Sequence, residues 1–190
     1  MEAGDTIPGY GLWIVLLYDV HMPKAILLIA KQGFQDVELD GTCKGLLAAG
    51  FEVTLVSTEA GECIGKFGGK ETATVAARDM DVDAFDRFAF IGGPGAHAFK
   101  DDPDILNLAH RIAESGKIFG AICIAPTALA AAGVLKGKKA TVWNGDGEQG
   151  TFIESHGAMY TGEHVTVDGR IVTADGPETA EEFGRVLAAI

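Results

Sequence analysis

The cysteine at position 123 lies in a sequence context that predicts a reactive thiol. Residues 119–126 read FGAICIAP, a hydrophobic strand that runs into a turn and then into a helix of small residues. Ala121 and Ala125 flank Cys123 two positions away on each side. This pattern is typical of a nucleophile elbow, where a sharp strand-to-helix turn forces the nucleophile outward and small neighbours let the backbones approach. The alternative is a buried structural cysteine that packs like a small hydrophobe.

An elbow would give Cys123 two measurable properties. Its backbone should be strained, as is common for residues at functional turns. The N-terminal N–H groups of the following helix would point at the sulfur and favour the thiolate. We therefore expect the pKa of Cys123 to lie below the ordinary value for a cysteine.

Two further segments carry groups that could act with this thiol. The turn Gly92-Gly93-Pro94-Gly95 follows a predicted strand, and its glycines would let backbone N–H groups approach a ligand, as an oxyanion hole requires. Glu38 lies among apolar positions of a predicted helix and would face inward if that helix packs on a sheet, although most glutamates lie on surfaces. A protonated Glu38 could donate a hydrogen bond to a thiolate, whereas an ionised carboxylate would oppose the thiolate by repulsion. All three segments follow the ends of strands, and ligands of open α/β sheets bind at that edge.

The elements that must position these residues alternate between strands and helices. The sequence pattern predicts strands at residues 24–30, 52–57, 88–91, 118–122, 140–143, 165–167 and 170–173, and a short ribbon around residues 72–75. It predicts helices at residues 35–49, 103–115, 127–132, 148–155 and 178–190. Asp168-Gly169 is a hairpin signal between the last two strands. This alternation favours an α/β fold with a mostly parallel sheet.

Taken in order, these segments resemble the ThiJ/PfpI family, the group of the parkinsonism-associated deglycase and intracellular protease I. The likeness runs from Met22 onward and includes FQDVE at residues 34–38, the GGPG turn, AIC at residues 121–123, AAGVLKG at residues 131–137 and IVTADGP at residues 171–177. The resemblance implies a three-layer sandwich of the flavodoxin-like, class I glutamine amidotransferase-like kind, with helices on both faces of the sheet. It also implies a homodimer or a homohexamer.

The resemblance further implies roles for individual residues. Cys123 would be the nucleophile and Glu38 its acidic partner. Gly93 and Ile124 would supply the N–H groups of the oxyanion hole, and Gly92 is a candidate to support them.

The chain departs from the family at the position after the cysteine. Many members have a histidine there, whereas this chain has Ile124, so the Cys–His dyad is missing at its usual place. Members that lack this histidine often use one after the next strand, where this chain has Asn144, a candidate that would act indirectly. His97 is the most suggestive base because it follows Gly93 by four residues, where some relatives place an acid that crosses a subunit interface. The alternative for each histidine of the chain is a solvated surface position.

Length and composition restrict the class of protein. The 190 residues suit one domain with a sizeable core, which we expect to span residues 22–190. The formal net charge of −12 argues against nucleic acid or an anionic membrane as a partner. Three cysteines at unrelated spacings give neither a disulfide framework nor a metal motif, which fits a reducing cytoplasm. We expect no metal and no cofactor.

Residues 1–21 form an extension before the first family-like strand. Residues 12–18 are apolar but too few to span a bilayer, and the extension lacks the basic start and the cleavage site of a signal peptide. We favour a misassigned start, with Met22 as the true first residue. The alternative is a genuine extra strand or an interface segment.

Two classes of function fit these residues. As an enzyme, Cys123 would attack a carbonyl of small dicarbonyls, or of their adducts on small molecules and proteins, in glyoxalase-III-like or deglycase-like chemistry. As a redox-sensing or chaperone-like stress protein, it would use the oxidation of Cys123 to sulfenic or sulfinic acid. An amidase or peptidase is a third alternative, weakened by Ile124. The glycine-rich turn slightly favours the enzyme, because a sensor needs no oxyanion hole.

Overall fold

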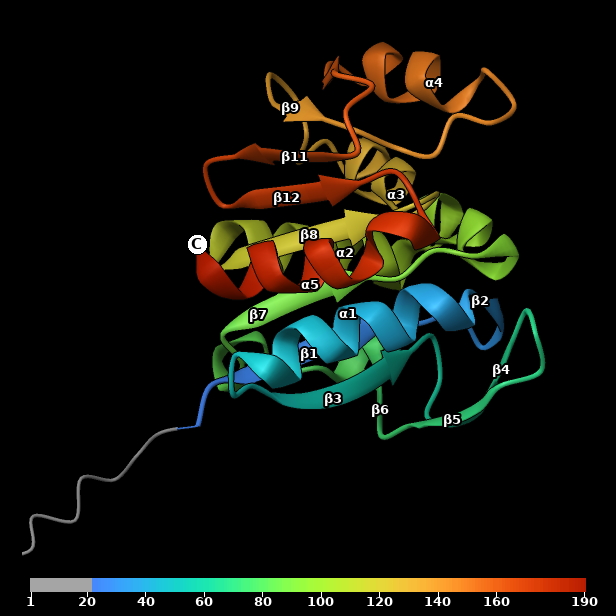
Figure 1. The fold of residues 1–190 in the computed structure, drawn as a ribbon, viewed down its shortest axis with the longest axis vertical. Helices are drawn as coiled ribbons and strands as arrows, with labels where there is room; N and C mark the ends of the chain where they lie inside the picture. Colours follow the sequence, from blue (N-terminus) through green and yellow to red (C-terminus); the bar gives the residue numbers. More distant parts are fainter. Residues whose placement is uncertain (1–21) are drawn as a thin grey trace, which may run out of the picture.

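Figure 1 shows the fold in a computed structural model, which describes residues 22–190. The expectation of an N-terminal extension concerns residues 1–21 and lies outside the described residues. No helix in the described part of the chain is both long enough and apolar enough to cross a membrane.

The centre of the fold is a seven-stranded sheet in the order β11-β12-β8-β7-β1-β3-β6. Its strands are β1 (Lys24–Leu28), β3 (Glu52–Ser57), β6 (Val75–Ala76), β7 (Arg87–Phe90), β8 (Ile118–Ile122), β11 (Val165–Asp168) and β12 (Ile171–Ala174). Neighbouring strands run parallel except in the β11–β12 pair, which is antiparallel. The inner strands are almost wholly buried, as the continuous apolar runs of a parallel sheet require. The predicted mostly parallel sheet is confirmed.

Helices cover both faces of this sheet. They are α1 (Asp36–Ala48), α2 (Pro103–Glu114), α3 (Pro126–Ala131), α4 (Gln149–Ser155) and α5 (Ala180–Ala189), with short 3₁₀ helices at Ala77–Asp79, Val82–Ala84, Pro94–Asp101 and Pro177–Thr179. In Figure 1, α1 and α5 lie side by side in front of the sheet, whereas α2 and α3 lie behind it. The predicted three-layer sandwich is therefore also confirmed.

Two small sheets flank the central one. The first joins β2 (Gln32–Phe34), β4 (Gly61–Gly65) and β5 (Lys70–Ala73), and the second joins β9 (Lys139–Ala140) and β10 (Met159–Tyr160). The sequence pattern did not predict β2, and the ribbon expected around residues 72–75 is the β4–β5 hairpin instead.

Two predicted segments differ in detail from the structure. The strand expected at residues 140–143 ends at Ala140, because the next N–H groups have other partners. Thr141 donates to Oγ1 of Thr173 at 2.8 Å, and Trp143 donates to the carbonyl of Cys123 at 2.8 Å. The β11–β12 turn begins one residue later than predicted, since Asp168 still belongs to β11 and Gly169 takes the positive φ of 62°.

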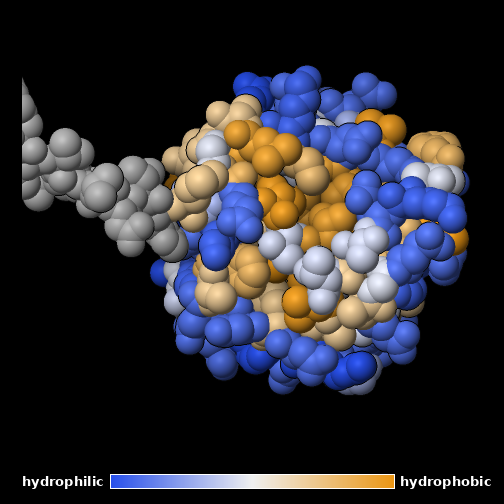
Figure 2. Space-filling model, turned by 90° about the horizontal axis from the view of Figure 1, so that it is seen from below, coloured by the Kyte–Doolittle hydropathy of each residue, from blue (hydrophilic) through white to orange (hydrophobic). Residues whose placement is uncertain are grey.

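The central sheet has β11 at one edge and β6 at the other. The edge formed by β3 and β6 faces the viewer in Figure 2. Hydrophobic surface lies near the middle of this face, and hydrophilic residues surround it. Because β6 pairs only with Val56 and Ser57, no strand among the described residues pairs with the first half of β3 on that side. Val53 and Leu55 of β3 are partly buried and pack against the core.

Candidate active site

Cys123 directly follows β8, at the end of the strand where the chain turns toward α3. Its φ of 61° makes it the one non-glycine residue with a positive φ in the described part of the chain. The flanking strand and loop hold this backbone, because the Cys123 N–H donates to Ala174 at 2.9 Å and its carbonyl accepts from Trp143. A left-handed conformation costs energy for a residue with a Cβ and persists only where the surroundings impose it. The strained elbow predicted at Cys123 is confirmed.

Glu38 lies in the first turn of α1, and its side chain is fully buried. Two hydrogen bonds join the start of this helix to the glycine-rich turn. The Gln35 N–H donates to the Gly92 carbonyl at 3.0 Å, and the Gly92 N–H donates to Oε2 of Glu38 at 3.0 Å. The other carboxyl oxygen, Oε1, is buried without a hydrogen-bond partner of ordinary geometry. The Cys123 thiol is nevertheless close enough to affect the pKa of this carboxyl.

The thiol and the carboxyl affect each other's ionisation. Burial raises the pKa of Glu38 from its ordinary value of 4.5 to about 7, although the Cys123 and Gly92 contacts and the Lys66 charge lower it. Burial, followed by the charge and the contact of Glu38, raises the pKa of Cys123 to about 12. The expected depressed pKa of Cys123 is therefore wrong, because burial and the nearby carboxyl outweigh the backbone N–H groups. Near neutral pH the thiol therefore keeps its proton, whereas Glu38 passes from the protonated to the ionised form.

Two backbone N–H groups are directed at the sulfur. They belong to Gly93 and Ile124, and both lower the pKa of Cys123. Neither group donates another hydrogen bond among the described residues. Gly93 has a φ of 110°, and a side chain there would collide with the backbone at Gly33 and Gln35. Two N–H donors that converge on a thiol, with no other acceptor among the described residues, form an arrangement that could hold a developing oxyanion.

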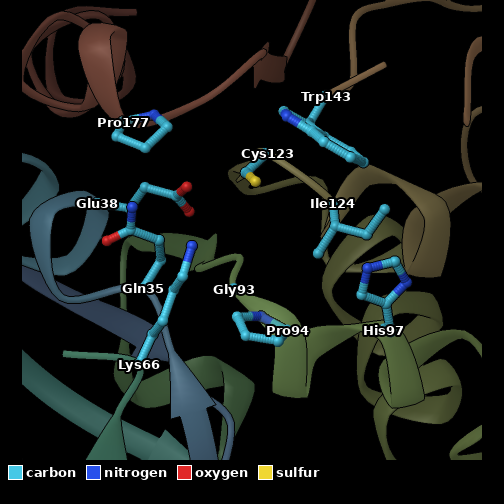
Figure 3. Close-up of a pocket in the computed structure, with 10 residues that line it drawn as sticks. All are labelled: Gln35, Glu38, Lys66, Gly93, Pro94, His97, Cys123, Ile124, Trp143 and Pro177. Carbon is cyan, nitrogen blue, oxygen red and sulfur yellow. The ribbon is translucent and has the colours of Figure 1, made fainter. Parts of the chain in front are cut away.

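The sulfur opens into a pocket of about 250 Å³ (Figure 3). The residues that line it are Gln35, Glu38, Lys66, Gly93, Pro94, His97, Cys123, Ile124, Trp143 and Pro177. Much of the wall is apolar, because it is formed by two prolines, an isoleucine and a tryptophan ring. Such a volume is below the usual range for drug-sized ligands and suits a molecule of a few heavy atoms.

The other two predicted site residues, His97 and Asn144, differ in whether they line the pocket. His97 lines the pocket, but in Figure 3 the side chain of Ile124 lies between its imidazole and the sulfur. Asn144 does not line the pocket, and its Oδ1 accepts from the Gly150 N–H at 2.9 Å near the start of α4. Roles for His97 and Asn144 remain predictions. Among residues 22–190, no three His, Cys, Asp or Glu side chains cluster so that they could hold a metal ion.

Sequence reasoning missed several lining residues, of which Lys66 is the most notable. It lies in the β4–β5 hairpin loop, and only the tertiary fold brings that loop to the pocket. Its sequence context, GKFGG, indicated no more than a loop. The sequence did contain a signal for Pro177. This residue comes shortly after β12, just as the turn of residues 92–95 comes shortly after β7, so both could be expected at the same edge of the sheet.

A three-layer α/β fold with a strained cysteine at the end of a central strand defines a class of proteins built on a nucleophile elbow. Within this class the chain belongs to the DJ-1/PfpI family, which it matches over residues 23–190.

Several relatives in this family are named as enzymes. A deglycase of Thermococcus kodakarensis is 29% identical over 80% of this chain and 90% of its own length. A glutathione-independent glyoxalase of Caenorhabditis elegans is also 29% identical, over 84% of this chain and 83% of its own length. An uncharacterised protein of Methanocaldococcus jannaschii shares 36% identity over 88% of this chain and 82% of its own length.

A solved structure agrees with the fold. The ThiJ/PfpI domain protein of Brachyspira murdochii superimposes with a TM-score of 0.82 at 28% identity, covering 87% of this chain and 94% of that one. The predicted family resemblance is confirmed, and an enzymatic role for members of this family is supported by the relatives' names.

Proposed function

We propose that this chain is a cysteine-dependent enzyme that acts on small dicarbonyls or on their adducts. The observation that carries the proposal is the convergence of the Cys123 thiol, the Glu38 carboxyl and the free N–H groups of Gly93 and Ile124 in one small pocket. These groups amount to a nucleophile, a base and an oxyanion hole, the three parts that addition to a carbonyl requires.

In the first step, Glu38 acts as the general base. Because the pKa of Cys123 is raised to about 12, the thiol needs a base to accept its proton as the sulfur attacks. Glu38, with a pKa of about 7, is substantially ionised near neutral pH and lies beside the thiol. The new S–C bond turns an aldehyde into a thiohemiacetal, whose oxygen would be held by the N–H groups of Gly93 and Ile124 and then protonated from Glu38.

The remaining steps need no external oxidant or reductant. With methylglyoxal, Glu38 would remove the C1 proton and deliver it to the C2 oxygen, which gives an enediol. It would then take the proton of the C1 hydroxyl and deliver it to C2, which leaves a lactoyl thioester on Cys123. Water then cleaves the S–C bond and releases lactate and the free thiol. The aldehyde carbon is oxidised and the ketone carbon is reduced, so the only co-reactant is water.

The raised pKa of Cys123 also bears on the sensor alternative. Oxidation by peroxides follows the thiolate fraction, which is small for a thiol whose pKa is about 12. A buried base beside the sulfur adds nothing to a sensor, whereas it completes an enzyme. The peptidase alternative is weaker still, because Ile124 supplies no histidine to protonate an amine leaving group.

We predict that the purified protein converts methylglyoxal to lactate without glutathione or another cofactor. Because Glu38 must be ionised, the rate should rise with pH and level off above about 7. The test is an assay of D- and L-lactate over a pH series, with Cys123→Ala as the blank. Lactate no higher than in this blank at every pH would overturn the proposal.

We also predict that a methyl group at Gly92 would disable the site. A Cβ there would lie 2.6 Å from the Cβ of Cys123, 2.7 Å from Oε2 of Glu38 and 2.9 Å from the carbonyl of Ile122. Gly92→Ala should therefore push the base away from the thiol and lower turnover by about a hundredfold. Overpacking should lower the free energy of unfolding by about 1 to 3 kcal/mol. Lactate assays and urea unfolding measure the two effects, and unchanged turnover would show that the close Glu38–Cys123 approach is not used.

A further inference from the structure

Hydrogen bonds hold Lys66 and the loop that carries it in place at the pocket. It follows β4 in the hairpin, and its N–H donates to the Phe34 carbonyl at 2.7 Å. The next residues are fixed by Asp36, whose carboxylate accepts from the Phe67 N–H at 2.9 Å and from the Gly69 N–H at 2.8 Å. Asp36 is the first residue of α1, the helix that carries Glu38. The loop and the base are therefore positioned by the same helix.

The ammonium of Lys66 lies near enough to Glu38 to lower the pKa of that carboxyl, but it is not ion-paired with any carboxylate in the described part of the chain. Lys66 forms no ion pair within residues 22–190, whereas Lys44 and Lys70 do. Its ammonium lies 5.2 Å from the centre of the Phe67 ring and lowers the pKa of Glu38. The Asp36 carboxylate already accepts hydrogen bonds from two N–H groups of this loop.

Lys66 also differs in character from the rest of the pocket. It is the one lysine or arginine among the ten lining residues. Figure 3 shows its amine on the Glu38 side of the cavity, opposite the apolar wall formed by Ile124 and Trp143. In a chain with a net charge of −12, a lone ammonium at the mouth of a site provides a local attraction for an anion that the surface as a whole would repel.

We propose that Lys66 selects carbonyl substrates that carry a carboxylate and holds that group while Cys123 attacks the neighbouring carbonyl. This inference rests on the proposed function and names its preferred substrates as small aldehydes or oxoaldehydes with a carboxylate. In the addition step the S–C bond forms, the π bond of the carbonyl breaks, and the thiol proton passes through Glu38 to the carbonyl oxygen. The carboxylate remains unchanged on Lys66.

Alkylation of Cys123 by a matched pair of reagents tests this selection without any turnover. Iodoacetate carries the carboxylate, and iodoacetamide is a neutral molecule of nearly the same size. The ratio of the two rates isolates recognition of the charge, because any change in the reactivity of the thiol affects both reagents. Mass spectrometry of the peptide that contains Cys123 separates its alkylation from that of Cys43 and Cys63.

In Lys66→Met, the ratio of the iodoacetate rate to the iodoacetamide rate should fall about fivefold, a typical effect of one charge near the surface. Lys66→Arg should restore most of the ratio, and 0.5 M salt should reduce the difference between wild type and Lys66→Met. Lys70→Met is the matched control, because it removes the same charge from the same hairpin at a residue that does not line the pocket. It should leave the ratio unchanged.

The outcomes separate this inference from the proposed function. An equal ratio in wild type and Lys66→Met, or an equal fall in Lys70→Met, would overturn the role of Lys66 even if the protein makes lactate. A fall confined to Lys66→Met would support the carboxylate site even if no lactate forms.

Discussion

Replacing Cys123 by alanine should lower the turnover of methylglyoxal by at least about a thousandfold, the scale seen when a catalytic nucleophile is removed. The fold should tolerate the change, because the flanking backbone is held by hydrogen bonds to Ala174 and from Trp143 that do not involve the side chain. Lactate assays would measure the loss, and thermal unfolding would show whether the variant is folded.

Cys43→Ala is the matched control for this experiment. Cys43 is a second partly buried free thiol, whose pKa is raised to about 11 by burial and by nearby acidic groups, but it does not line the pocket. Its removal should leave turnover nearly unchanged. Equal losses in the two variants would contradict a specific role for Cys123. If neither wild type nor Cys43→Ala forms lactate, while peroxide oxidises Cys123 faster than Cys43, the sensor would replace the enzyme.

The sequence predicted the parts of the site that depend on local structure. The elbow at Cys123 follows from a buried strand, small neighbours and a helix start, all within residues 119–126. The inward direction of Glu38 follows from its apolar neighbours on one helix. Both are properties of short segments, and the structure agrees with both.

The sequence could not predict properties that depend on how far groups lie from one another. The sign of the pKa shift at Cys123 is one example, since it depends on burial and on the approach of Glu38, which a helix dipole argument omits. The place of Lys66 is another, because it depends on the two hydrogen bonds that join Asp36 to the hairpin loop. The strand predicted at residues 140–143 failed for a similar reason, as contacts with Thr173 and Cys123 take up its N–H groups.

Replacing Glu38 by glutamine should make the Cys123 thiol more acidic and yet lower turnover. The pKa of Cys123 should fall, because the carboxyl that raises it is gone while the N–H groups of Gly93 and Ile124 remain. Turnover of methylglyoxal should nevertheless fall by about a hundredfold to ten-thousandfold, because glutamine cannot accept the proton of the thiol. The pH dependence of the iodoacetamide rate measures the first effect, and lactate assays measure the second.

The iodoacetamide and lactate measurements together decide whether the proton lies on Cys123 or on Glu38 in the wild type. A higher pKa of Cys123 in Glu38→Gln would mean that a protonated Glu38 stabilises a thiolate in the wild type, as the sequence had first suggested. Glu38→Leu is the control for the amide, which could itself donate to the sulfur. A fall in both variants assigns the effect to loss of the carboxyl, whereas a fall in the glutamine variant alone assigns it to the new donor.

The same substitution should stabilise the fold above neutral pH. The folded pKa of Glu38 is about 7 and its ordinary value is 4.5, so the folded state binds its proton more tightly than the unfolded chain does. The favourable contribution is complete below pH 4.5 and is lost as pH rises through about 7. Above that pH the wild type keeps a buried charge at a cost of about 3 kcal/mol, which Glu38→Gln avoids while its side-chain oxygen can still accept from the Gly92 N–H. Urea unfolding at pH 5 and pH 8 should show the variant gaining stability over the wild type at the higher pH. An equal difference at both values would mean that Glu38 does not carry a raised pKa, and the general base would then have to be another group.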